Sequence, residues 1–299
     1  MTTQPRSPET ETARRRSPLA AAALALAALA VLTQVAHPLL SGSALHVTTV
    51  VAVVLFAAAV LADSARRFGP RTAAAVLVVA GGLGLLAEAV GTRTGLPFGE
   101  YSYAGTLGAQ VLDVPVVVPL AWTMMAYPML LAGRTLAPPG SWTAVPVAAV
   151  GLASWDLFLD PMMVAEGHWT WVDPTPALPG VPGVPLTNYA GWLLVALVIT
   201  AVLHRVVPDP RRTPRPRRTG AVSRLVRPAA PGTERARGSA ELAVPGLLLG
   251  WTWIGSTVDA LVFSGRPWAG LWGFVVMGAV VAPTLAHWFW AAGPMRRRR

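Results

Sequence analysis

The chain has 299 residues, of which 54% are apolar and only 13% charged, and its mean hydropathy of +0.52 excludes an ordinary soluble domain and indicates an integral membrane protein. The formal net charge of +10 comes entirely from arginine, because the sequence contains no lysine. The absence of cysteine excludes disulfides, thiol catalysis and thiolate metal sites.

Eight apolar runs are long enough to cross a bilayer, which takes about 17 to 25 residues of helix. In chain order they cover residues 18–40, 46–62, 72–92, 114–135, 142–162, 188–207, 242–263 and 268–291. The sequence therefore predicts an all-α integral membrane protein, a bundle of about eight transmembrane helices.

The arginines predict the orientation of the bundle, because basic residues collect in short cytoplasmic loops. With the N-terminus inside, every arginine except Arg93 and Arg266 falls in a cytoplasmic segment. An odd number of helices would separate the termini and break this pattern. We therefore expect both termini to be cytoplasmic, in a multi-pass protein of the cell's inner (plasma) membrane.

The predicted organisation is one membrane bundle with polar segments around it. A disordered basic tail (1–17) precedes a six-helix core (18–207), a disordered Arg/Pro-rich cytoplasmic linker (208–241), the last two helices of the same bundle (242–291) and a basic tail (292–299). The linker is suited to anionic lipid headgroups; it contains no aromatics, so nucleic-acid binding is not expected. A secretory signal peptide is the alternative interpretation of the first apolar run.

An acid pair stands out in the fifth run. Asp156 and Asp160 lie four residues apart in the apolar, aromatic-rich stretch 151–171, and a helix would place both carboxyl groups on one face. Carboxylates are costly at membrane depth and are functional candidates by default. Two so close cannot easily both ionise, so one is expected to hold a proton, as a general acid does. Because Pro161 follows, we expect the helix to end or kink there.

Other ionisable groups are expected at a similar depth. Glu88 and Asp259 fall in the outer halves of the third and seventh spans, and His37 falls near the end of the first. If their helices are neighbours, these groups line one polar pocket facing the bundle interior. We expect its walls to include Trp155, Trp251 and Trp253.

The middle of the chain resembles a known family. The residues that carry the resemblance are Gly95–Tyr103, Leu107-Gly108, Val114-Pro115, Pro119–Trp122, Tyr127-Pro128, Ala153–Pro161, Trp169–Trp171 and Val184–Trp192. These blocks look like those of the CruF-type carotenoid biosynthesis proteins, a family of carotenoid hydratases that includes bisanhydrobacterioruberin hydratases. Family members often carry Gln after the Asp-Pro, where this chain has Met162, so a role for that side chain is not carried over.

The resemblance implies addition of water to the terminal C=C bond of a linear carotenoid, giving a tertiary alcohol. Protonated Asp156 or Asp160 is the candidate acid, with Glu88 and Asp259 as the other candidate catalytic residues. Candidate substrate-binding residues are Trp155, Tyr101, Tyr103, Trp122, Trp169, Trp171, Asn188 and Trp192. Water is the second substrate, and no metal or other cofactor is expected, since the sequence has no phosphate-binding glycine loop and no cluster at ligand spacing.

Several alternatives remain open from the sequence. The acid pair could be a structural ion pair with Arg93 or Arg266, or could hydrogen-bond backbone groups freed by Pro161. Asn188 could be a helix N-cap, and the loop aromatics could form an interfacial belt. A carotenoid cyclase or isomerase would use the same acid pocket, and a lipid or isoprenoid transporter is the non-enzymatic alternative. A transporter would be expected to show an internal repeat, and none is visible.

Overall fold

The computed structural model describes residues 8–211 and 241–290. Helices dominate this part of the chain, which confirms the predicted all-α membrane fold. The predicted C-terminal tail 292–299, most of the linker 208–241 and residues 1–7 of the N-terminal tail lie outside the described residues. The first helix begins at Pro8, earlier than the start at residue 18 that the apolar run indicates.

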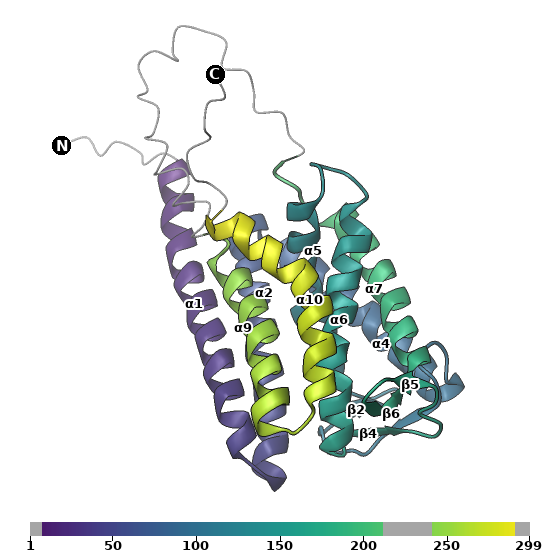
Figure 1. Ribbon diagram of the computed structural model, residues 1–299. Coiled ribbons are helices and arrows are strands. Elements are labelled where there is room, and N and C mark those ends of the chain that lie inside the picture. Colours follow the sequence, from purple (N-terminus) through teal and green to yellow (C-terminus); the bar gives the residue numbers. More distant parts are fainter. Residues whose placement is uncertain (1–7, 212–240, 291–299) are drawn as a thin grey trace, which may run out of the picture.

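Each predicted span corresponds to one helical segment (Figure 1). In chain order these are α1 (Pro8–Ala36), α2 (Gly42–Phe68), α3 (Pro70–Val76) continued by η2 (Leu77–Gly81) and α4 (Gly82–Thr94), α5 (Val117–Leu136), α6 (Ala144–Ala165), α7 (Leu186–Val206), α9 (Ala243–Val258) continued by η4 (Asp259–Phe263), and α10 (Pro267–Leu285) continued by η5 (Ala286–Trp290). A short turn, η1 (His37–Leu39), follows α1. Within the described residues, 7 of these segments are long and apolar enough to cross a membrane.

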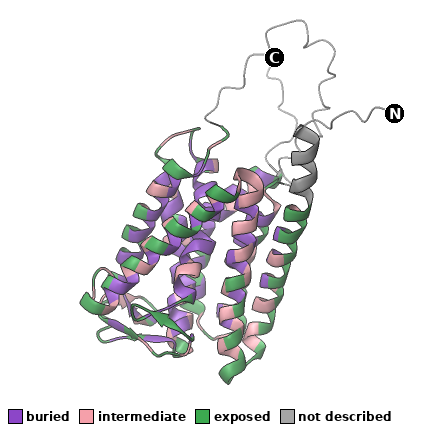
Figure 2. Ribbon diagram, turned by 180° about the vertical axis from the view of Figure 1, so that it is seen from behind, coloured by how far each residue is buried: buried purple, intermediate pink, exposed green. Residues whose placement is uncertain are grey.

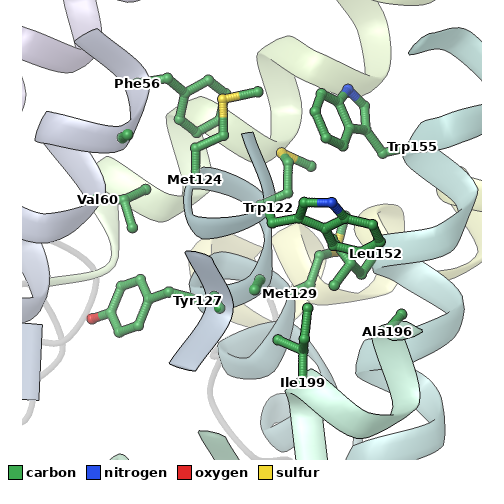
Figure 3. Close-up of a cluster of buried hydrophobic side chains, with 14 of the residues drawn as sticks. Phe56, Val60, Trp122, Met124, Tyr127, Met129, Leu152, Trp155, Ala196 and Ile199 are labelled. Atoms are coloured by element: carbon green, nitrogen blue, oxygen red, sulfur yellow. The ribbon is translucent and has the colours of Figure 1, made fainter. Parts of the chain in front are cut away.

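The remaining helical segment, α5, is the centre of the bundle. It packs against α2, α6, α7 and α10, and nearly all of it from Val117 to Arg134 is buried. Because α5 faces protein more than lipid, it can carry Thr123, Tyr127 and Arg134 among its apolar residues. Figure 3 shows Trp122, Met124, Tyr127 and Met129 of α5 within the buried cluster that it shares with α2, α6 and α7.

The outer surface of the bundle is apolar, as a membrane requires. Exposed residues follow the outward faces of the helices, while buried residues fill the interior (Figure 2). Leu32 is 62% exposed, Val78 70% and Val262 69%. Such large exposed apolar faces would be an aggregation liability in water but match the hydrocarbon of a bilayer.

The two ends of the bundle differ. The start of α1 and the end of η5 lie together at one end (Figure 1), as an even number of crossings requires. The opposite end carries three two-stranded antiparallel ribbons: β1 (Tyr101–Tyr103) with β4 (Trp169–Trp171), β2 (Gln110–Val111) with β3 (Val114–Pro115), and β5 (Ala177–Leu178) with β6 (Val181–Pro185). Which end faces the cytoplasm remains a prediction.

Helix α6 does not end at the acid pair, which was one of the two outcomes expected from Pro161. Helix α6 continues past this residue to Ala165. A proline removes one backbone donor and crowds the preceding turn. Here Pro161 is itself buried, and α6 is packed against α5, α7 and α10, so tertiary packing holds the last turn in place. Asp160 therefore lies inside the helix and not at its end.

Candidate active site

A cavity opens inside the bundle toward the end that carries the ribbons. Its volume is about 170 Å³, roughly ten times what one water needs, so it has room for an organic group. Helices α1, α2, α4, α5, α6, α7 and α9 and strands β1 and β4 contribute to its wall. The cavity is lined by all of the predicted substrate-binding residues, namely Trp155, Tyr101, Tyr103, Trp122, Trp169, Trp171, Asn188 and Trp192.

The predicted carboxyl groups take different places around the cavity. Glu88, Asp160 and Asp259 line it, whereas Asp156 lies behind Asp160, away from the lining. His37 also lines the cavity. The structure thus brings together groups from α4, α6, η4 and η1 that the sequence placed at one depth.

The acid pair is held by an amide. Asp156 and Asp160 are 0% and 2% exposed, and the i, i+4 spacing on α6 puts them on one face. Asn188 of α7 donates Nδ2 to Asp156 Oδ2 at 2.8 Å and also to Asp160 Oδ2. The two carboxyl groups interact electrostatically with each other. Two buried carboxyl groups this close cannot easily both ionise, so this pair is suited to sharing a proton.

The alternative roles considered for this pair and its amide do not match the geometry. Arg93 instead donates to Asp113 Oδ2 at 2.7 Å and to the carbonyl of Ala89 at 2.8 Å. Arg266 pairs with Asp259. The N-cap position of α7 is occupied by Pro185, so Asn188 is not a helix cap.

Glu88 sits in a different environment. Tyr101 OH donates to Glu88 Oε2 at 2.5 Å, Tyr103 OH to the same oxygen at 2.8 Å, and Trp122 Nε1 to Oε1 at 3.1 Å. Burial raises the pKa of both tyrosine hydroxyls above the ordinary value, and the charge of Glu88 raises it further, so both remain donors. Three donors converging on one carboxyl group suit a carboxylate.

The pairing of β1 with β4 brings the two aromatic loops together. Tyr101 is opposite Trp171 and Tyr103 is opposite Trp169, with ring centroids 5.7 and 5.6 Å apart. Deeper in the bundle, Trp192 of α7 stacks on Trp122 at 4.0 Å and meets Trp155 edge-on at 5.9 Å. Aromatic rings therefore surround both the Glu88 carboxylate and the acid pair.

The expected wall residues of α9 are only partly right. Trp251 lines the cavity and donates Nε1 to Gln34 Oε1 at 2.7 Å. Trp253 does not line it; its ring stacks on Phe274 of α10, and its Nε1 donates to the carbonyl of Phe274 at 2.9 Å. Side chains two positions apart on a helix point in directions about 200° apart, so the two indoles cannot face the same cavity.

The comparisons with known proteins agree with this geometry. A family described as "Carotenoid biosynthesis protein" matches residues 47–227, more than half of the chain. The chain belongs to the carotenoid biosynthesis protein family. A curated relative, the bisanhydrobacterioruberin hydratase of Haloarcula japonica, is 41% identical over 113 residues, a match that covers 36% of this chain and 36% of the relative. No solved structure matches.

The family match covers most but not all of the cavity of this carotenoid biosynthesis protein. Glu88, Asp156, Asp160 and Asn188 fall inside the matched residues 47–227. The wall that α1 and α9 contribute, with His37 and Asp259, falls outside them. Asp259 is engaged by Ser264 Oγ at 2.7 Å and by Arg266 Nη2 at 3.1 Å, so its environment differs from that of the acid pair.

The structure of this family member also contains polar groups that the sequence did not single out. Asp63 is fully buried and accepts hydrogen bonds from Arg66 Nη2 at 2.6 Å and Tyr127 OH at 3.1 Å. Its spacing of three residues from Arg66, near the end of an apolar run, was a signal for such a pair. Asp63 does not line the cavity, so we regard it as structural.

A second hollow lies beside the cavity, on the membrane-facing side of α2. Its wall combines one face of α2, including Val47, Val51 and Val54, with the segment from Thr106 to Leu120. Those three valines are exposed. Leu107 and Val117 line both this groove and the cavity, so the two spaces meet at these side chains.

Proposed function

We propose that this protein is a carotenoid hydratase, which adds water across the terminal C=C bond of a linear carotenoid end group to give a tertiary alcohol. The observation that carries the proposal is a buried acid pair, Asp156 and Asp160, bound by one amide at the wall of an aromatic-lined cavity inside a membrane bundle. The name of the curated hydratase relative supports the same reaction.

Asp160 is the proton donor in this proposal, because it lines the cavity while Asp156 lies behind it. Its proton forms a C–H bond at the less substituted alkene carbon, using the electrons of the π bond. The other carbon becomes a tertiary cation. Asn188 then stabilises the Asp160 carboxylate that is left, through the hydrogen bond that it already donates to it.

The cation needs negative charge close by and protection from elimination. The Glu88 carboxylate supplies charge, since its three donors fix it in place and it interacts electrostatically with Asp160. The faces of Trp122, Trp155 and Trp192 are available for cation–π stabilisation, on the order of 1–2 kcal/mol each when desolvated. Asp259 faces Arg266, so we assign it to positioning.

The length of the proposed substrate gives the groove a function. A linear carotenoid is many times longer than its end group, so most of the polyene must lie outside a cavity of about 170 Å³. The apolar groove along α2 shares the side chains of Leu107 and Val117 with the cavity and faces the membrane. We therefore place the polyene in this groove and the reacting end group beside Asp160.

The mass of the pigment separates hydration from its competitors. The chain would be expressed in a bacterium that accumulates a linear carotenoid, and the molecular mass of the extracted pigment would be measured. A hydratase adds one water. An unchanged mass with an altered absorption spectrum would indicate a cyclase or isomerase. A pigment unchanged in both mass and spectrum would indicate a transporter. Either result would overturn the proposal.

A further inference from the structure

A second polar cluster adjoins the cavity, built from the end of α1 and the loop after α6. His37 Nε2 lies 2.9 Å from Thr49 Oγ1 and 3.7 Å from Glu166 Oε2. Glu166 Oε2 is in turn 3.3 Å from His168 Nε2, and His168 Nδ1 is 2.7 Å from Thr106 Oγ1. A carboxylate thus lies between two imidazoles, one of which lines the cavity.

The residues of this cluster do not satisfy all of each other's hydrogen bonds. Glu166 Oε2 and His168 Nε2 are buried and lie 3.3 Å apart without hydrogen-bond geometry, so neither has a hydrogen-bond partner among the described residues. His168 is only 1% exposed. Buried polar atoms without a protein partner are where ordered water binds, and a buried water typically makes about three hydrogen bonds. Glu166 Oε2 and His168 Nε2 are two such atoms, and the ring of His37 lies next to them, 3.7 Å from Glu166 Oε2.

The proposed reaction needs such a place. After protonation by Asp160, the tertiary cation must be captured by one water held close to the cavity, and the bound water must then lose a proton. His37 is the only imidazole among the described residues that line the cavity. Glu166, at 3.7 Å, is placed to hold the ring and to stabilise its protonated form.

We propose that His37, supported by Glu166 and His168, binds the capturing water and takes its proton. The lone pair of the water forms the C–O bond, and the released proton passes to the imidazole. It then returns to the Asp160 carboxylate through water, so that one molecule of water is added and no proton is consumed. This assignment rests on the proposed hydratase function and adds to it a base separate from the acid.

Deuterium exchange distinguishes the two roles. In D₂O, protonation of the alkene followed by loss of a proton returns the substrate with deuterium, even when no water is captured. We expect His37→Gln to lower the hydrated product by roughly 10²-fold, as for other lost general bases, while deuterium still enters the recovered substrate. Asp160→Asn should lose both signals.

His287→Gln is the matched control, because His287 is an exposed imidazole of η5 that lines neither the cavity nor the groove. It should hydrate at nearly the wild-type rate. Glu166→Gln should show the His37→Gln pattern more weakly, and it carries the test if His37→Gln does not accumulate in the membrane. Product and exchange are both expressed per folded protein.

The assignment is overturned if His37→Gln and Glu166→Gln hydrate normally, or if exchange falls together with product. A wild-type protein that neither hydrates nor exchanges would instead remove the proposed function, and the assignment with it. If the wild-type protein hydrates and the His37→Gln and Glu166→Gln variants hydrate equally well, only the role of His37 is excluded.

Discussion

Replacing Asn188 with leucine removes the group that holds the acid pair. The change keeps most of the volume and deletes both donors to Asp156 and Asp160. One bond goes to a carboxylate, worth about 1.5–3 kcal/mol, and one to a neutral carboxyl, worth about 0.5–1.5 kcal/mol. We therefore expect a loss of about 2–4.5 kcal/mol from a total stability that is typically about 5–15 kcal/mol.

The same substitution should slow the reaction, because Asn188 stabilises the carboxylate that the acid leaves behind. A loss of about 1.5–3 kcal/mol at about 1.36 kcal/mol per tenfold corresponds to roughly 10- to 100-fold less product per folded molecule. Melting in detergent measures the first effect, and product normalised to folded protein measures the second.

Thr200→Val on the same helix is the control for Asn188→Leu. Thr200 is buried and donates to the carbonyl of Ala196 at 2.7 Å, but it does not line the cavity. It should change stability slightly and product per folded molecule not at all. Wild-type melting and wild-type product in Asn188→Leu would refute the reasoning about the pair.

Three further predictions follow from the cavity, the groove and the arginines. Glu88→Gln should lower product per folded molecule by roughly 10²-fold or more, as for other electrostatic stabilisers; unchanged product would exclude a role for its charge. Leu107→Trp should block conversion of a long carotenoid but spare a short acyclic isoprenoid with the same end group, whereas Val198→Trp on the outer face of α7 should affect neither; equal loss on both substrates would contradict the groove. A reporter after Arg299 should lie in the cytoplasm and one at Thr175 outside, and the reverse result would invert the bundle.

The elements that the sequence predicted well are those set by local physics. Apolar length alone located all eight helical segments, and the i, i+4 spacing put Asp156 and Asp160 on one face. The same reasoning could have excluded Trp253 from the cavity, since it lies two residues from Trp251 on one helix. The helix does not end at Pro161, because tertiary packing overrides a local break.

The rest depends on contacts between distant parts of the chain. Nothing local links Tyr101 to Trp171 across the β1–β4 ribbon, or Asn188 to the two aspartates of α6. His37 could be placed at the right depth, but its neighbour Glu166 could not, because the loop after α6 folds back onto the end of α1. Such clusters become visible only when the helices are packed.

The most direct test of the acid pair is to replace Asp160 with asparagine and to measure both folded protein and hydrated pigment. Asparagine keeps the shape and much of the hydrogen bonding but has no proton of suitable acidity to transfer. The account predicts near-normal protein with product reduced by roughly 10²–10⁴-fold, and Asp156→Asn should behave similarly because the pair shares one proton. Near-normal hydration by both variants, or loss of folded protein with full activity per remaining molecule, would contradict it.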